Sequence, residues 1–326
     1  MTHGAAGGRP AGTRPAREPV RESVRRLPAP ALRPFVAWYS GYRQAGVPPA
    51  MHRGLPSPEL TLIVTLEDPL VIAAHPDPRQ PAGEYDVLIG GLHTTPALIT
   101  HEGRQAGVQL GLTPLGARAL LGMPAGELAA WDVHGADVLG RFAAELRDRV
   151  RAAASWPARF AVIDDLLARR AETGASMRPE VSHAWHRLLA ARGAVPVSAL
   201  AEQTGWSARH LTGQFRAETG LTPKAAARVM RFTVARRQVQ RLYTAGVGEG
   251  VGEGAGEGAP KPERPAAAAT LADLAAACGY YDQAHLARDF RDLAGCPPSV
   301  WFTEEFGPRF RNVQATPAGR GESSAA

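Results

Sequence analysis

Two stretches of the sequence carry arginine and amide side chains inside one repeated pattern. The first stretch is "GWSARHLTGQFRAETGLTP" (205–223) and the second is "GYYDQAHLARDFRDLAGCPP" (279–298). Arg209 and Arg288 each carry the planar fork of donors that pairs bidentately with guanine, and Gln283 carries the amide that reads adenine. These residue types therefore favour recognition of base edges in a DNA groove.

Six pairs of residues match in type and in order between the two stretches. The pairs are Gly205 and Gly279, Trp206 and Tyr280, Leu211 and Leu286, Phe215 and Phe290, Gly220 and Gly295, and Pro223 and Pro298. A glycine suits a turn that needs positive φ, and a leucine followed four residues later by phenylalanine gives a helix one apolar face. Each copy therefore predicts two helices joined by a tight turn, the helix-turn-helix arrangement.

The second helix of such a unit can lie in the major groove, with residues near its N-terminus at the base edges. The predicted base contacts are Arg209, Thr212, Gly213, Gln283, His285 and Arg288. Contacts to phosphate position a protein without specifying sequence. The predicted phosphate contacts are Ser207, Arg216, Lys224, Arg228 and Asp282, of which Ser207 and Asp282 are also expected to be N-caps.

Positive charge is concentrated around the first copy. The chain has 326 residues and a net charge of +6, yet residues 183–243 carry ten basic and two acidic residues, net +8. Residues 244–305, which contain the second copy, carry four basic and ten acidic residues, net −6. A local excess of positive charge is typical of a surface that binds a polyanion.

The N-terminal half predicts a different kind of domain. Short segments rich in Val, Ile, Leu and Thr, separated by Pro, Gly and Asp, are expected to be strands at 59–68, 70–75, 85–93, 96–103 and 106–114. Helical spacing of apolar residues follows at 138–153 and 156–172. The expected fold class is α+β and multidomain, with a mainly β barrel-like or sandwich-like N-terminal domain and an all-α C-terminal domain.

The doubled pattern resembles the DNA-binding domain of the AraC/XylS family of transcriptional regulators. The resemblance is carried by "LAEQTGWSARHLTGQFRAETGLTPKAA" and "LADLAAACGYYDQAHLARDFRDLAGCPPSVW" and covers about residues 183–305. It implies a sequence-specific regulator that places both recognition helices in adjacent major grooves of promoter DNA. It also implies an N-terminal effector or dimerisation domain, which the strand-rich region resembles less specifically.

The domain organisation expected from these observations has five parts. They are a disordered basic tail (1–26), a β-rich sensor-like domain (27–135), a helical bridge (136–182), an AraC-type DNA-binding domain (183–306) and a disordered tail (307–326). Within the DNA-binding domain we expect helix-turn-helix units at about 197–217 and 271–292, a linker helix at 223–243 and a flexible insertion at 245–269.

The insertion and the acidity of the second copy depart from the family pattern. The insertion is expected to let the two units move more independently, and the acidic residues to weaken phosphate contacts of the second unit. The first copy is therefore expected to contribute more affinity and the second more discrimination between sequences.

Two other classes of function compete with this interpretation. A small-molecule-binding or metal-dependent β-barrel enzyme would use histidines of the N-terminal region, namely His52, His75, His93 and His101, but no His-x-His pair occurs among them. Sequence-independent DNA packaging is the other alternative. We expect no catalytic activity, no cofactor and no metal.

The remaining expectations concern the setting and the partners. Cys278 and Cys296 are too few for a disulfide framework, no apolar run is long enough to span a bilayer, and no signal peptide is visible. We expect a cytoplasmic protein without membrane association. Its expected partner is double-stranded promoter DNA, with RNA polymerase, an unidentified small-molecule effector and a second copy of the chain as further candidates.

Overall fold

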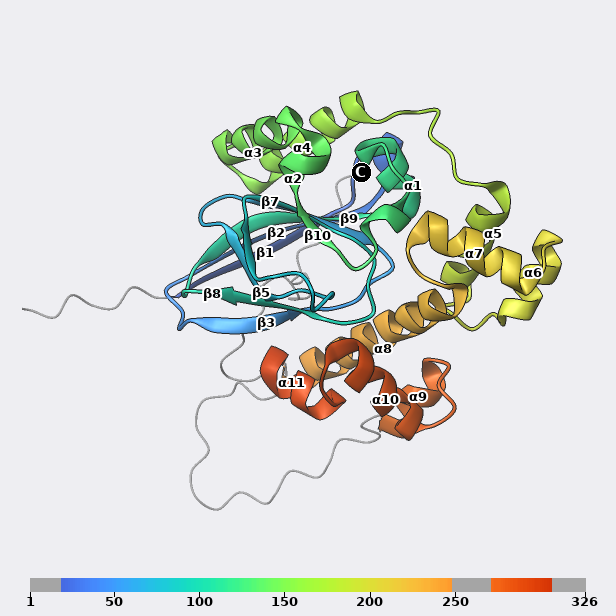
Figure 1. The fold of residues 1–326 in the computed structure, drawn as a ribbon. Coiled ribbons are helices and arrows are strands. Elements are labelled where there is room, and N and C mark those ends of the chain that lie inside the picture. Colours follow the sequence, from blue (N-terminus) through green and yellow to red (C-terminus); the bar gives the residue numbers. More distant parts are fainter. Residues whose placement is uncertain (1–18, 248–270, 307–326) are drawn as a thin grey trace, which may run out of the picture.

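The computed structural model describes residues 19–247 and 271–306 of the chain. A β-rich region comes first and a helical region follows it, with one long helix passing along the sheets toward the C-terminal helices (Figure 1). This arrangement confirms the expected α+β class with a mainly β N-terminal part and a helical C-terminal part.

The described strands of the N-terminal region form two sheets. They are β1 (Val20–Arg26), β2 (Val36–Ala45), β3 (Ala50–Gly54), β4 (Leu60–Thr65), β5 (Leu70–Ala74), β6 (Gly83–Tyr85), β7 (Val87–Gly90), β8 (Ala97–His101), β9 (Gln105–Leu112) and β10 (Asp132–His134). The larger sheet has the order β1-β2-β9-β4-β7-β10 and the smaller has the order β3-β8-β5-β6. All of the strand pairings are antiparallel.

Alternation along β4 explains how the larger sheet buries both of its faces. Leu60, Leu62 and Val64 belong to one hydrophobic cluster, whereas Ile63 belongs to a second cluster that contains residues of the smaller sheet. Successive side chains of a strand point to opposite faces, so neighbouring residues enter different cores. One face of the larger sheet therefore packs on the smaller sheet and the other packs on helices.

Two groups of helices complete the fold. The N-terminal group comprises η1 (Pro30–Leu32), α1 (Pro114–Gly116), η2 (Ala117–Leu121), η3 (Ala125–Leu128), α2 (Gly135–Leu139), α3 (Arg141–Ala152) and α4 (Trp156–Arg170). The C-terminal group comprises α5 (Pro179–Ala190), α6 (Val197–Thr204), α7 (Ala208–Thr219), α8 (Pro223–Val247), α9 (Leu271–Ala277), α10 (Gln283–Ala294) and α11 (Pro298–Phe306). Helices α3 and α4 lie over the larger sheet in Figure 1.

The expected strands at 59–68, 70–75, 85–93, 96–103 and 106–114 correspond to β4, β5, β7, β8 and β9. The disordered tail was predicted to reach residue 26, and this is wrong over Val20–Arg26, which form β1. The segment is polar and charged, but it pairs along its whole length with β2. Pairing with a neighbouring strand outweighs the weak strand preference of its own residues.

The C-terminal helices share a core with the β region. Trp185 of α5 packs against Phe215 of α7, with ring centroids 5.8 Å apart, and Phe232 of α8 packs against Phe290 of α10 at 4.9 Å. The main hydrophobic cluster runs without a break from the larger sheet into these helices.

Helix α8 covers the predicted linker helix at 223–243 and continues to Val247. The predicted insertion at 245–269 lies mostly outside the described residues, as do the predicted tail at 307–326 and residues 1–18 of the predicted N-terminal tail. None of the helices within the described ranges combines the length and the apolar character that a membrane span requires.

Candidate functional site

The first helix-turn-helix unit consists of α6 and α7. Gly205 closes α6 in the left-handed region at φ 70°, where a side chain would be strained. Ser207 caps α7, since its hydroxyl oxygen accepts a hydrogen bond from the His210 backbone N–H at 3.2 Å. Leu211 and Phe215 are fully buried and fix α7 on the rest of the domain. Helices α6 and α7 thus have a left-handed glycine between them, a serine cap and a buried Leu–Phe pair.

The second unit consists of α9 and α10 and repeats this construction. Gly279 has φ 77°, and the carboxylate of Asp282 accepts a hydrogen bond from the His285 backbone N–H at 2.6 Å. Leu286 and Phe290 are fully buried, as their counterparts are. The sequence repeat is therefore a structural repeat.

Each unit also carries an aromatic side chain that packs edge-on against a histidine of its second helix. The ring centroids of Trp206 and His210 are 4.6 Å apart at 77°, and those of Tyr280 and His285 are 5.1 Å apart at 87°. Tyr280 is buried and Trp206 is partly buried, so both belong to the packing of the turn. The offset that relates Leu211 to Leu286 also relates His210 to His285, a signal in the sequence that would have added His210 to the predicted contacts.

Most of the residues predicted to contact bases are exposed to solvent. Arg209 and Gly213 of α7 and Gln283 and Arg288 of α10 are exposed, whereas Thr212 and His285 are half-buried. The Thr212 hydroxyl donates to the Ala208 carbonyl oxygen at 2.7 Å and is therefore engaged within its own helix.

The predicted phosphate contacts fall into two groups. Arg216 and Lys224 are exposed and extend the basic surface of the first unit. Ser207 and Asp282 are exposed but already serve as N-caps, so their side-chain oxygens have backbone partners.

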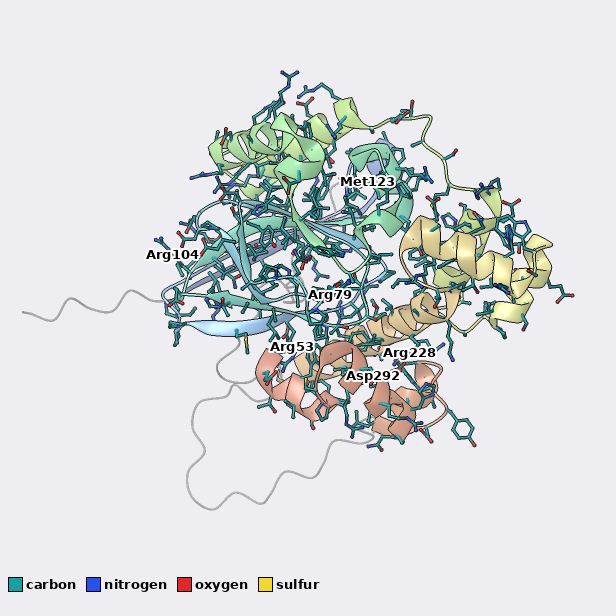
Figure 2. All side chains as sticks on the ribbon, in the orientation of Figure 1. Arg53, Arg79, Arg104, Met123, Arg228 and Asp292 are labelled. Carbon is teal, nitrogen blue, oxygen red and sulfur yellow. The ribbon has the colours of Figure 1, made fainter. Side chains whose placement is uncertain are left out.

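Arg228 differs from the expectation. Its guanidinium on α8 is 2.8 Å from the Asp289 carboxylate and 2.6 Å from the Asp292 carboxylate, both on α10. Arg228 and Asp292 lie side by side between these helices in Figure 2. Asp289 is buried. Arg228 therefore holds the second unit on α8 instead of standing free for phosphate.

The first unit is docked against the β region at the end of α7. Glu218 is buried and forms two hydrogen bonds with Arg118 of η2, the longer of them 2.7 Å. The backbones approach closely beside this ion pair, because a Cβ on Gly126 of η3 would lie 2.1 Å from the Ala217 carbonyl oxygen. Sequence reasoning missed this contact, since nothing local marks two residues that are 100 positions apart.

The second unit touches the β region through different residues. Glu304 of α11 forms an ion pair with Arg53 of β3. A Cβ on Gly295, which closes α10 in the left-handed region, would lie 3.4 Å from the Pro96 side chain. Both helix-turn-helix units are thus in contact with the N-terminal region.

A cavity of about 120 Å³ lies between the two sheets and is bordered on one side by α8. Aliphatic side chains of both sheets line its interior, while Arg25, Arg53 and Arg236 supply cationic groups and His93 and Asp132 supply polar ones. Arg236 and Gln240 belong to α8, so the cavity reaches the boundary between the N-terminal region and the C-terminal helices.

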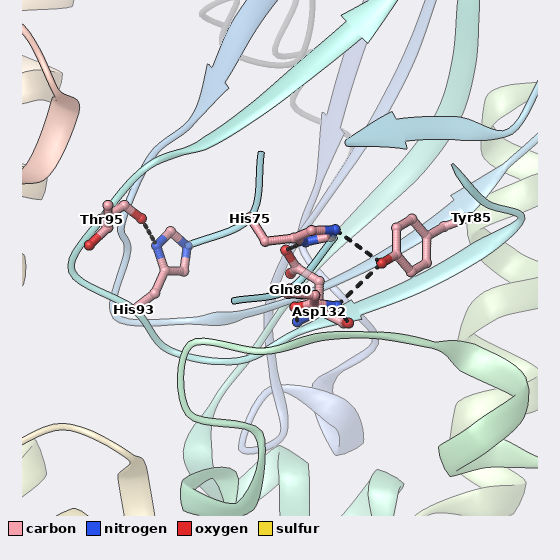
Figure 3. Close-up of polar contacts among 6 residues, drawn as sticks. All are labelled: His75, Gln80, Tyr85, His93, Thr95 and Asp132. Carbon is pink, nitrogen blue, oxygen red and sulfur yellow. Dashed lines mark hydrogen bonds and ion pairs between the residues drawn. The ribbon is translucent and has the colours of Figure 1, made fainter. Parts of the chain in front are cut away.

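A buried polar network adjoins this cavity (Figure 3). His75 Nδ1 is 2.7 Å from the Asp132 carboxylate, and His75 Nε2 is 3.3 Å from the Tyr85 hydroxyl. The Gln80 side chain makes hydrogen bonds to the backbone of Asp132. The network fixes the orientation of Asp132 at the edge of the larger sheet.

The histidines singled out in the sequence do not gather into a metal centre. His52 and His101 have ring centroids 6.2 Å apart, and burial followed by the proximity of His101 lowers the pKa of His52 to about 3. Over residues 19–247 and 271–306, no group of three or more His, Cys, Asp or Glu side chains is placed to hold a metal ion. Cys278 and Cys296 are buried, and neither forms a disulfide bond.

Comparisons with known proteins gave one family match, in the N-terminal region. Residues 24–134 match a family described as a domain of unknown function, DUF6597. A search of curated proteins found no match.

Among solved structures, the match to ToxT from Vibrio cholerae covers 81% of this chain and 97% of the ToxT chain, at 8% sequence identity and a TM-score of 0.42. ToxT with a bound unsaturated fatty acid covers 89% and 97%, at 7% identity and a TM-score of 0.40. The AraC-like transcriptional activator CuxR covers 69% and 88%, at 14% identity and a TM-score of 0.25.

Proposed function

We propose that this protein is a sequence-specific DNA-binding transcriptional regulator of the AraC type. The observation that carries the proposal is the structural doubling of the helix-turn-helix. Two units with the same turn, the same capping geometry and the same buried Leu–Phe pair each leave the N-terminal half of the second helix open to solvent. An exposed helix of this kind is the element that enters a major groove.

The proposed roles follow from exposure and chemistry. Arg209 near the start of α7 and Arg288 in the middle of α10 are exposed and carry the side chain that pairs with guanine, and exposed Gln283 at the start of α10 carries the amide that pairs with adenine. Arg216 and Lys224 contact phosphate and set the position of the first unit on the duplex. Arg228 acts indirectly, because it fixes the orientation of α10 through Asp289 and Asp292.

We further propose that the N-terminal region regulates the placement of the two units. The Arg118–Glu218 pair anchors the first unit and the Arg53–Glu304 pair anchors the second. A change in the N-terminal region that favours one of these contacts over the other would alter the relation between the recognition helices. Conformational coupling of this kind requires differential contacts in two states, and these two pairs supply candidates.

The proposal is tested by selecting binding sites from random duplexes with the full-length protein and measuring their affinity against scrambled duplexes at physiological salt. We expect the selected site to bind at least about 10³-fold more tightly than scrambled DNA. The double variant Arg209→Ala, Arg288→Ala is expected to lose this preference, and Arg169→Ala, an exposed change on α4, is the matched control. Equal binding to selected and scrambled duplexes would instead identify a packaging protein, and no binding to either would reject both.

A further inference from the structure

The two helix-turn-helix units share one support, helix α8, and their relative orientation depends on how each unit packs on that helix. Phe232 of α8 packs against Phe290 of α10, and Arg228 of α8 pairs with two carboxylates of α10. Residues 248–270 separate α8 from α9 in the chain. A connection can span up to about 3.3 Å per residue, so the covalent link alone permits many placements of the second unit. Contacts between side chains must therefore fix its orientation.

Arg231 contacts both units from the middle of α8. Its Nη1 donates a hydrogen bond of 2.7 Å to the Gly193 carbonyl oxygen, in the loop between α5 and α6. Its guanidinium carbon lies 6.0 Å from the centre of the Tyr280 ring, in the turn of the second unit. Its aliphatic stem passes the same turn, because a Cβ on Gly279 would lie 3.8 Å from Arg231 Cδ. Arg231 thus bridges the two units.

The attachment point in the first unit is rigid. Arg192 and Gly193 follow α5, and both have a left-handed backbone, at φ 53° and φ 78°. This conformation is costly for a residue with a side chain and persists only where the surroundings hold it. A Cβ on Gly193 would lie 2.1 Å from the Ala227 carbonyl oxygen of α8, so the two backbones are in close contact. Helix α5 in turn holds α7, through the packing of Trp185 against Phe215.

The attachment point in the second unit leads to α10. Tyr280 is buried, and its backbone N–H donates to the Ala275 carbonyl oxygen of α9 at 2.9 Å. Its ring packs edge-on against His285 of α10, with ring centroids 5.1 Å apart. A guanidinium group above an aromatic ring is attracted by the quadrupole of the ring. The position of Arg231 therefore influences the first turn of α10 through a single aromatic side chain.

The chemistry of the bridge suits arginine better than lysine. A planar guanidinium group presents several donors in a fixed fork and also stacks on aromatic rings. Arg231 uses one donor for Gly193 while its cation stays close to Tyr280. A lysine ammonium group is a compact point charge and would favour one of these partners over the other.

We propose that Arg231 is a positioning residue that sets the relative orientation of the two recognition helices. It acts through Gly193 on the unit that contains α7 and through Tyr280 on the unit that contains α10. The orientation in the free protein does not depend on the proposed function, whereas the consequence for DNA rests on it. That consequence is a preferred spacing between the two halves of the binding site.

Distances in the full-length protein without DNA test the coupling directly. Spin labels are attached to Glu202→Cys on α6 and Ala276→Cys on α9, both exposed positions, and their separation is measured by pulsed electron spin resonance. Cys278 and Cys296 are buried, and burial raises the pKa of both thiols, so the labels react with the introduced cysteines. We expect one narrow distribution of distances with Arg231 present and a broad distribution in Arg231→Ala.

Further variants separate the bridge from charge and from stability. Arg231→Lys keeps the charge without both contacts, and Tyr280→Leu removes the ring, so each is expected to broaden the distribution. Tyr280→Phe keeps the ring and is expected to leave the distribution narrow. Arg237→Gln, an exposed change on α8, is the matched control. Hydrogen exchange in α7 and α10 is measured for every variant, and unchanged exchange beside a broad distribution identifies a loss of coupling without unfolding.

The consequence for DNA is tested on the selected site with base pairs added or removed between its two halves. The intact protein is expected to lose at least about tenfold in affinity when the spacing changes by about two base pairs, because the second helix then meets a different side of the duplex. Arg231→Ala is expected to lose less than about threefold over the same series. Affinity for each half-site alone is expected to be equal in both proteins, which a general loss of stability would not allow.

Two results would overturn the proposal. One is an equally narrow distribution of distances in Arg231→Ala, and the other is a distribution that is already broad in the intact protein. An unchanged dependence on spacing in Arg231→Ala would overturn the consequence for DNA. Equal binding of selected and scrambled duplexes by the intact protein rejects the proposed function, and the label distances, which need no DNA, still decide the coupling. The two failures are therefore distinguishable.

Discussion

The two helix-turn-helix units have the same interior and different surroundings. Leu211 and Phe215 in the first unit and Leu286 and Phe290 in the second are all fully buried. The first unit ends on a buried glutamate, Glu218, that reaches across to the N-terminal region. The second unit pairs Asp289 and Asp292 with Arg228 of α8, among the C-terminal helices, and Glu304 of the following helix, α11, reaches the N-terminal region. The interior of a helix-turn-helix unit and the way in which the unit is anchored are therefore separable features of this chain.

This difference changes the meaning of the acidic charge in the second copy. The sequence count assigns four basic and ten acidic residues to 244–305, which suggested a surface that repels phosphate. Asp289 is buried against α8, and both it and Asp292 are paired with Arg228. Part of the negative charge of the second copy is thus neutralised within the protein by Arg228, which the sequence analysis predicted to contact phosphate.

The largest expected effect concerns the shared interior. Phe215→Ala and Phe290→Ala should each destabilise their unit by about 3–5 kcal/mol, because each removes a fully buried aromatic side chain. Hydrogen exchange resolved by peptide measures this in α7 and in α10. We expect each change to raise the rate of exchange in its own unit, if the two units differ only in their anchors. A comparable loss of protection from exchange in both units after either change would show that the units unfold together.

The Arg228 anchor is expected to have the next largest effect. Arg228→Ala leaves the buried Asp289 carboxylate without its cation, and we expect a loss of about 1.5–3 kcal/mol, seen as faster hydrogen exchange in α10. Lys224→Ala, an exposed change on the same helix, serves as the control. Unchanged exchange in α10 would mean that the ion pairs do not hold the second unit.

The recognition residues should separate the units by function. Arg209→Ala is expected to weaken binding to scrambled duplexes as well as to the selected site, since the first unit lies in the basic segment. Arg288→Ala is expected to weaken mainly the selected site, by about 1–3 kcal/mol, and to relax sequence preference. Titrations by fluorescence anisotropy measure both. An equal loss of non-specific affinity from the two changes contradicts the division into an affinity unit and a discrimination unit.

The smallest effect is expected at the periphery of the first unit. Lys224→Ala should weaken binding to all duplexes uniformly and reduce the slope of log affinity against log salt by about 1, because one phosphate contact is lost. Arg228→Ala should leave that slope unchanged, since its charge is already paired with two carboxylates. A slope that falls equally in both variants would restore Arg228 as a phosphate contact.

Local pattern was sufficient to predict the two units. The spacing of Gly205, Ser207, Leu211 and Phe215 specifies a turn, a cap and an apolar face within a dozen residues, and the second copy repeats it. Five strands followed from short runs of β-branched residues for the same reason. Contacts between distant segments were not predictable, because neither Arg118 nor Glu218 carries a local sign of its partner.

The same limit explains the errors. Val20–Arg26 is a strand because β2 lies beside it, and Arg228 is an internal cation because α10 lies beside α8. The cavity likewise depends on Arg25, Asp132 and Arg236, which come from separate parts of the chain and meet only in the folded protein. Residue type indicates which interactions these groups can make, whereas the partner that each group has depends on which segments pack together in the folded protein.

The central claim is that both units read DNA, and methylation interference at guanine N7 on a selected site tests it most directly. Guanine N7 lies in the major groove, so methylation there blocks a reading helix. We predict two clusters of interfering guanines about one helical turn, or 10–10.5 base pairs, apart, with one cluster lost in Arg209→Ala and the other in Arg288→Ala. A single cluster that persists in one of these variants and disappears in the other would contradict the claim, because only one unit would then read the groove.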